Sequence, residues 1–60
     1  MDEQANLREQ SELAQSILTT WDNCADDGSF SPEQLNSLAH EAYRLAELVS
    51  ALAEFRQRRA

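Results

Sequence analysis

Acidic side chains gather near the middle of the chain, around the stretch Asp26-Asp27-Gly28-Ser29-Phe30-Ser31-Pro32-Glu33-Gln34-Leu35. Carboxylate oxygens are the ligands that calcium takes most readily in proteins. The stretch therefore raises the question of whether this chain binds a metal ion. The acidic residues of this region, called the acidic tip, are Asp22, Asp26, Asp27 and Glu33.

The same stretch resembles the second half of an EF-hand calcium loop, in which a glycine is followed two residues later by an apolar residue. If Gly28 takes the sixth position of such a loop, Asn23, Ala25 and Asp27 take the first, third and fifth, and Gln34 takes the twelfth. The EF-hand requires oxygen ligands at the first, third and fifth positions and a bidentate glutamate at the twelfth. Ala25 offers no side-chain oxygen, and Gln34 is neutral. We therefore expect no calcium site, and we expect no cofactor.

A second interpretation of this stretch is that a helix begins within it. Ser31 is a favoured N-cap residue, and Pro32 follows at the first helical position, where its fixed φ is suitable. Gln34 stands three residues after Ser31, which completes the sequence pattern of a capping box. Phe30 before the cap and Leu35 at the fourth helical position fit a hydrophobic staple. The residues between Phe30 and Leu35 thus predict the start of a helix.

The only glycine and the only proline of the chain, Gly28 and Pro32, divide it into two arms. Gly28 suits the left-handed residue that ends a helix. Both arms are rich in Ala, Leu, Glu, Gln and Arg, which favour helices. We therefore predict an all-α fold with a single domain. Its helices cover about residues 3–26 and 32–58, joined by a turn at 27–31 into an antiparallel two-helix hairpin.

Apolar residues recur at alternating steps of three and four in both arms, which is the spacing of a coiled-coil contact line. In the second arm, this spacing predicts a line made of Leu35, Leu38, Ala42, Leu45, Val49 and Leu52. In the first arm, it predicts a line made of Leu7, Gln10, Ala14, Ile17, Trp21 and Cys24. Gln10 is a polar interruption that either sets the register or lies at a wet helix end. Trp21 is either a core residue or an interface anchor.

A chain of 60 residues buries a small core, so such chains usually need a disulfide, a metal or a second copy. Cys24 is the only cysteine and His40 the only histidine, which excludes an intrachain disulfide and a Cys/His zinc cluster. We therefore expect a homodimer, with two hairpins forming a four-helix bundle, or a complex with another protein. The expected dimer or partner interface consists of Leu13, Ile17, Leu18, Trp21, Leu45, Leu48, Val49, Leu52 and Phe55.

The formal net charge is −6, with 11 acidic residues against 5 basic ones. This balance disfavours binding to nucleic acid or to anionic membranes, which need a positive surface. No apolar run approaches the roughly 18 residues of a transmembrane helix, so we expect a cytoplasmic protein. Arginine without lysine suggests a bacterial or phage source.

Three arginines close the second arm, where cations suit the helix dipole. This basic tail consists of Arg56, Arg58 and Arg59. One interpretation is that these arginines pair with Asp2 and Glu3 of the first arm. A second is that two hairpins pack antiparallel, so that the acidic tip of one lies beside the basic tail of the other.

The sequence does not predict an enzyme. No nearby serine or cysteine is placed for His40 to act on it as a general base, and a two-helix chain offers little of the concavity that a substrate site needs. A small interaction module is therefore expected: a regulator, an inhibitor or a co-chaperone. The start Pro32-Glu33-Gln34 followed by a Leu/Ala-rich helix looks like that of the small co-chaperones of type III secretion needle subunits. The resemblance implies a helical hairpin that binds a protein.

Two alternatives belong to other functional classes. The predicted dimeric hairpin is similar to the architecture of Rop-like regulators, which bind paired RNA loops, and this similarity implies nucleic-acid binding. The chain lacks the basic stripe that such binding uses, because Arg8 and Arg44 are isolated along the arms. An acidic, phage-type inhibitor of a host protein that binds nucleic acid is the other alternative, and it requires a basic target.

Overall fold

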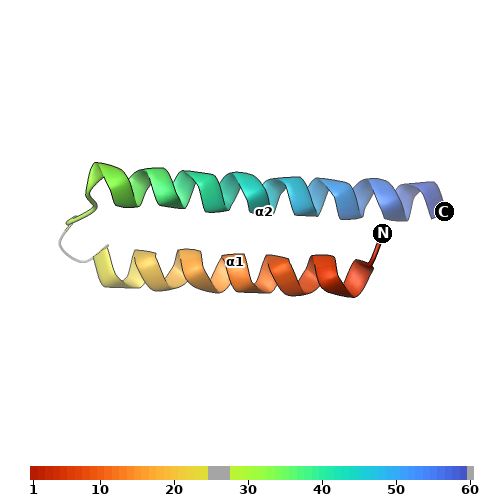
Figure 1. Ribbon diagram of the computed structural model, residues 1–60, viewed down its shortest axis with the longest axis horizontal. Helices are drawn as coiled ribbons and strands as arrows, with labels where there is room; N and C mark the ends of the chain where they lie inside the picture. Colours follow the sequence, from red (N-terminus) through yellow and green to blue (C-terminus); the bar gives the residue numbers. More distant parts are fainter. Residues whose placement is uncertain (25–27, 60) are drawn as a thin grey trace.

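Two antiparallel helices form the described part of the protein. The computed structural model describes residues 1–24 and 28–59, which contain α1 (Glu3–Cys24), α2 (Pro32–Arg59) and no strand. The helices lie side by side, with both ends of the chain at the end away from the turn (Figure 1). The molecule measures 46 × 16 × 14 Å. The all-α prediction is confirmed, while the predicted end of the first helix at residue 26 lies outside the described residues.

Asp2 caps the start of α1, a role that was not predicted. The Asp2 Oδ1 atom accepts a hydrogen bond from the Ala5 N–H at 3.1 Å. The Asp2 carbonyl oxygen accepts the N–H of Asn6, also at 3.1 Å. An aspartate in this position satisfies a free N–H group of the first turn and places its negative charge at the positive end of the helix dipole.

The start of α2 has the predicted capping box. The Ser31 Oγ atom accepts the N–H of Gln34 at 3.1 Å, and the Gln34 Oε1 atom accepts the N–H of Ser31 at 2.9 Å. The Ser31 carbonyl oxygen accepts the N–H of Leu35 at 3.0 Å. Pro32 is the first helical residue, where its missing N–H costs no hydrogen bond.

The turn before α2 depends on glycine. Gly28 has a φ of 65°, the left-handed conformation predicted for it, which side chains with a Cβ atom disfavour. The Ser29 N–H donates to the Cys24 carbonyl oxygen at 3.3 Å, a bond typical of helix ends formed by glycine. The Phe30 ring packs against Trp21 of α1, with ring centroids 5.4 Å apart and planes tilted by 56°. Phe30 therefore ties the turn to α1.

The contact line between the helices is the set of buried and half-buried residues that recur at steps of three and four. On α1 it consists of Asn6, Gln10, Leu13, Ile17, Thr20 and Cys24. On α2 it consists of Gln34, Leu38, Glu41, Leu45, Leu48, Leu52 and Phe55. Two cross-helix hydrogen bonds fix its register: the Asn6 side chain reaches the backbone of Leu48, and the Gln34 side chain reaches Cys24.

The predicted contact line was wrong in about half of its positions. Ile17, Cys24, Leu38, Leu45 and Leu52 do face the partner helix. The predicted members that are exposed instead are Leu7, Trp21, Leu35, Ala42 and Val49. The reason is that each helix carries two adjacent rows with the same heptad spacing, and the row that packs includes polar residues. A pattern based on hydrophobicity alone selects the more apolar row.

Candidate protein interaction surface

Exposed apolar side chains form a stripe along α1. The exposed members are Leu7, Leu18 and Trp21, and the half-buried Ala14 lies between them; the steps of 7, 4 and 3 place all four on one side of a helix. Leu18 is 61% exposed and Trp21 is 53% exposed. These two fractions are large for apolar side chains of this size, so the hairpin alone leaves this side of α1 largely uncovered.

A matching stripe runs along α2. Leu35, Ala42 and Val49 recur every seven residues, each followed four residues later by an alanine (Ala39, Ala46 and Ala53), and all six are exposed. Leu35 is 51% exposed and Val49 is 48% exposed, whereas the adjacent Leu48 in the contact line is only 7% exposed. A shift of one residue along α2 therefore separates the packed row from the uncovered one.

The two stripes lie on the same side of the hairpin. On α1, Leu7, Ala14 and Trp21 each come one residue after a member of the contact line. On α2, Leu35, Ala42 and Val49 likewise each come one residue after a member of the contact line. In an antiparallel helix pair, positions that follow contact residues in this way flank the contact line on one common side. We call this surface the apolar face: Leu7, Ala14, Leu18, Trp21, Leu35, Ala39, Ala42, Ala46, Val49 and Ala53.

The opposite side of the hairpin is polar. Glu9 and Arg44 come just before contact residues, and they form an interhelical salt bridge, with 2.9 Å between Arg44 Nε and Glu9 Oε2. The hydrogen bonds to the Glu9 carboxylate raise the pKa of Arg44 above its usual value, so Arg44 stays charged. We call this surface the polar face: Glu9, Glu12, Ser16, Ser37, His40, Arg44, Glu47 and Glu54.

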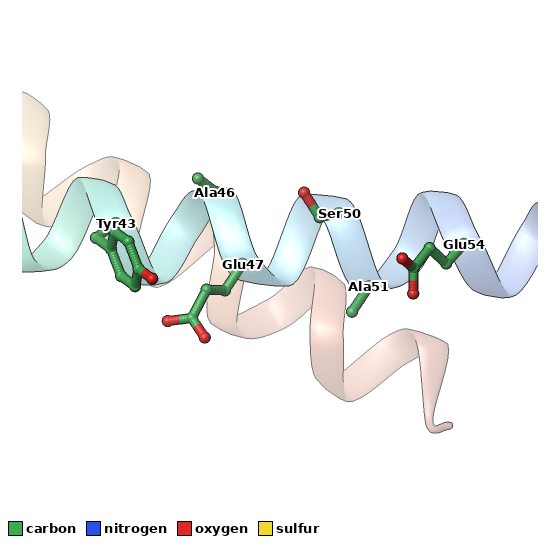
Figure 2. A pocket seen from close by; sticks show the side chains of 6 residues that line it. All are labelled: Tyr43, Ala46, Glu47, Ser50, Ala51 and Glu54. Carbon is green, nitrogen blue, oxygen red and sulfur yellow. The ribbon is translucent and has the colours of Figure 1, made fainter.

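A shallow groove lies on the outer surface of α2. It is lined by Tyr43, Ala46, Glu47, Ser50, Ala51 and Glu54, and all six belong to this one helix (Figure 2). A groove with walls from a single helix encloses little of a small molecule, in contrast to the concave sites of most ligand-binding proteins. Residues 1–24 and 28–59 also contain no group of three or more His, Cys, Asp or Glu that could hold a metal ion.

A polar pair lies inside the contact line near the start of α1. Asn6 is only 7% exposed, and its Nδ2 atom donates to the Leu48 carbonyl oxygen at 3.1 Å. Gln10 is half-buried, and its Nε2 atom donates to the Asn6 Oδ1 atom. Of the two interpretations of Gln10, the structure therefore supports a polar residue within the packed line. Sequence reasoning missed Asn6, although its position one turn before Gln10 was a usable signal.

The second polar contact in the line lies at the turn end. The Cys24 thiol is buried, and its Sγ atom accepts a hydrogen bond from the Gln34 Nε2 atom at 3.3 Å. The same Gln34 side chain also completes the capping box through its oxygen. One residue thus joins the start of α2 to the end of α1.

The basic tail contacts the start of α1. The Arg56 Nε atom lies 2.7 Å from the Glu3 Oε1 atom, and this hydrogen bond lowers the pKa of Glu3. The charges of Arg56 and Arg59 act on Glu3 in the same direction. The Arg59 guanidinium lies 5.5 Å from the centre of the Phe55 ring. Arg58 and Arg59 form no salt bridge with a described residue.

The acidic tip is only partly described. Asp22 and Glu33 are exposed near the turn, and neither forms a salt bridge with a described residue. Asp26 and Asp27 lie outside the described residues, as does Ala25. Of the two acidic residues predicted to pair with the basic tail, Glu3 forms a salt bridge with Arg56. Asp2 instead caps α1.

The predicted interface residues divide into two groups. Leu13, Ile17, Leu45, Leu48, Leu52 and Phe55 lie in the contact line inside the hairpin. Leu18, Trp21 and Val49 lie on the apolar face and are available to another molecule. Trp21 is therefore not a residue of the hairpin core. Leu7, Ala14, Leu35 and Ala42 were predicted for the contact line but belong to this face. Its other alanines were not among the predicted interface residues: Ala39, Ala46 and Ala53.

Neither α1 nor α2 combines the length and the apolar character that a membrane-spanning helix requires, as far as the described residues extend. Comparison with protein-family models, with curated proteins and with solved structures gives no match to this chain. The function is therefore inferred from the chain's own residues.

Proposed function

We propose that this protein is a small, non-enzymatic interaction module that acts as a regulator, an inhibitor or a co-chaperone. It works as a homodimer of helical hairpins or bound to a partner protein. The observation that carries this proposal is the apolar face, which runs along both helices on one side of the hairpin. A catalytic role has no support from the shallow groove on α2, which only one helix lines.

The size of the apolar face supports a binding role. Its five large side chains, each about half exposed, together present on the order of 400 Å², before the alanines are counted. The largest apolar patch of a typical monomer covers about 300–600 Å² and often belongs to a functional surface. Each Å² covered by a partner contributes roughly 25 cal/mol, so covering this surface favours association.

A second hairpin is a suitable partner for the apolar face. Two hairpins stacked face to face form a four-helix bundle, in which each helix buries its stripe against the other pair. A molecule 46 Å long and 16 Å wide offers an area close to the roughly 800 Å² per partner of a stable interface. The dimer would also supply the additional burial that a chain of 60 residues needs.

The polar face would remain free in such a dimer. Its four glutamates outnumber its one arginine, Arg44, which is already paired with Glu9. A target bound there would carry positive charge, in line with the net charge of −6. The same surface disfavours the Rop-like alternative, because phosphate groups would meet carboxylates.

The proposal is tested by placing charge on the apolar face. The double variant Trp21→Glu/Val49→Glu should dimerise at least about 100-fold more weakly than the unchanged chain, because both side chains would have to be desolvated in the interface. The matched control Ser16→Glu/Ser37→Glu adds the same charge to the polar face and should change the dimer constant only a few-fold. Sedimentation equilibrium over a wide concentration range measures all three chains.

The unchanged chain decides the outcome even if the charged variant loses its helices. A wild-type chain that stays monomeric and fully helical at several hundred micromolar would contradict the dimer. Equal weakening by the two double variants would contradict the assignment of the interface to the apolar face. Circular dichroism at each concentration separates loss of association from loss of helix.

A further inference from the structure

Two groups of exposed charged side chains lie at opposite ends of the long axis of the molecule. Asp22 and Glu33 lie at the turn end, and Arg58 and Arg59 close α2 at the other end. None of these four forms a salt bridge with a described residue. The molecule is 46 Å long, several times the screening length of about 8 Å at physiological salt. The two ends of one chain therefore cannot neutralise each other, but a second chain can bring opposite charges together.

The apolar face is arranged symmetrically about its middle. On α1, Leu7 and Trp21 stand seven residues on either side of Ala14, and on α2, Leu35 and Val49 stand seven residues on either side of Ala42. Seven residues of helix extend about 10 Å. A two-fold axis through the middle of this face would therefore bring Trp21 of one copy to the level of Leu7 of the other.

Side-chain size differs between the two halves of this face. Trp21, Leu18 and Leu35 make the turn half bulky, while the terminal half offers Leu7, Val49 and Ala53. An antiparallel arrangement places bulky residues opposite smaller ones, which lets the surfaces interdigitate. A parallel arrangement would instead bring the two bulky turn halves to the same level and leave a gap at the other end.

We infer that the partner on the apolar face is a second copy of this chain, packed antiparallel, so that the acidic turn of each copy lies beside the arginine tail of the other. This inference rests on the proposed function, because it specifies how the dimer is assembled. Asp22 and Glu33 of one copy then attract Arg58 and Arg59 of its partner at both ends of the bundle. The charges select this orientation, and the apolar face supplies most of the affinity.

A single spin label measures the orientation. Gln57 is exposed near the end of α2, fifteen residues from Ala42. In the antiparallel dimer, two labels at position 57 are separated by about 45 Å along the bundle at 1.5 Å per residue, whereas in a parallel dimer they lie side by side. The label is attached to Gln57→Cys in a Cys24→Ala background and the distance is measured by double electron–electron resonance. An unchanged dimer constant for the background chain serves as the control.

Charge reversal provides an independent test. The variant Arg58→Glu/Arg59→Glu should dimerise roughly 10-fold more weakly than wild type at low salt, and high salt should remove the difference. Mixing it with Asp22→Arg/Glu33→Arg should restore tight heterodimers, because each pair of facing ends is again oppositely charged. In a parallel dimer, reversing the tail replaces one repulsion with another, so its dimer constant would stay the same.

The outcomes separate the two proposals. A dimer with labels close together, or with an unchanged constant after tail reversal, would overturn the antiparallel arrangement and leave the apolar face as the interface. A wild-type chain that remains monomeric would overturn the dimer itself. A distance near 45 Å together with rescue in the mixture would support the antiparallel arrangement.

Discussion

The two sides of this hairpin differ in kind although the same two helices build both. On the polar face, Glu9 and Arg44 join the helices through a salt bridge in contact with water. On the apolar face, Trp21, Leu18 and Val49 are about half exposed. A hairpin needs only a narrow contact line to hold together. The second apolar row therefore points to association with another molecule.

The contact line inside the hairpin contains more polar residues than the apolar face on its surface. The contact line contains Asn6, Gln10, Gln34 and Glu41, whereas Trp21 and Leu35 lie outside it. A chain selected only for the stability of a lone hairpin would place its largest apolar residues inside and its polar ones outside. The opposite distribution is expected if the polar residues fix the register of the hairpin and the apolar residues bind a partner.

Leu48 and Val49 are adjacent on α2, but Leu48 lies in the contact line and Val49 on the apolar face. Substituting each in turn gives the largest expected difference in stability. Leu48→Ala should destabilise the protein by about 2–5 kcal/mol at any protein concentration, because it removes a side chain from the contact line. Val49→Ala should cost about 0.5 kcal/mol or less in dilute solution, where the apolar face is uncovered. Urea unfolding at two protein concentrations measures both. Equal costs in dilute solution would contradict the boundary.

The register that decides which row is exposed should depend on Asn6. Asn6→Ala removes the hydrogen bonds to the Leu48 carbonyl oxygen and to Gln10, and it should cost about 1–3 kcal/mol. The exposed neighbour Gln4 offers a matched control, since Gln4→Ala should change stability by less than about 0.5 kcal/mol. Thermal unfolding followed by circular dichroism compares the two variants. No difference between them would remove the proposed role of Asn6.

The start of α2 holds the register from the other end. Ser31→Ala should cost on the order of 1 kcal/mol, because the N–H of Gln34 loses its acceptor. Ser37→Ala replaces an exposed serine inside the same helix and should be neutral or slightly stabilising, since alanine is the better helix former. Chemical denaturation of both variants measures the difference. A neutral Ser31→Ala would show that water caps α2 equally well.

The smallest expected effect is the pH dependence of the Glu3–Arg56 salt bridge, which lies outside both faces. The pKa of Glu3 is lowered in the folded protein, so its contribution to stability is present above its unfolded pKa near 4.5 and is lost as pH falls through the lower folded value. Glu3→Gln should therefore lower the melting temperature slightly at pH 7 and have no effect near pH 2. Melting curves of both chains across this range test the sign. A difference that grows toward acid would contradict it.

Local signals in the sequence predicted the start of α2 better than they predicted the packing. The capping box of Ser31 and Gln34 could be predicted because its partners are three residues apart and each side chain reaches the backbone N–H of the other residue. The contact line depends on which of two similar rows meets the other helix, and local spacing does not contain that information. Asn6 and Gln34 decide it through bonds to residues 42 and 10 positions away.

The buried thiol of Cys24 can report local opening of the hairpin near the turn. Cys24 is 6% exposed, so a reagent such as iodoacetamide can modify it only when the turn end opens locally. The rate of alkylation thus measures how often that end separates, without any added probe. If a second copy covers the neighbouring Trp21, the thiol should be modified more slowly as protein concentration rises, and the kinetics of one cysteine would follow assembly in real time.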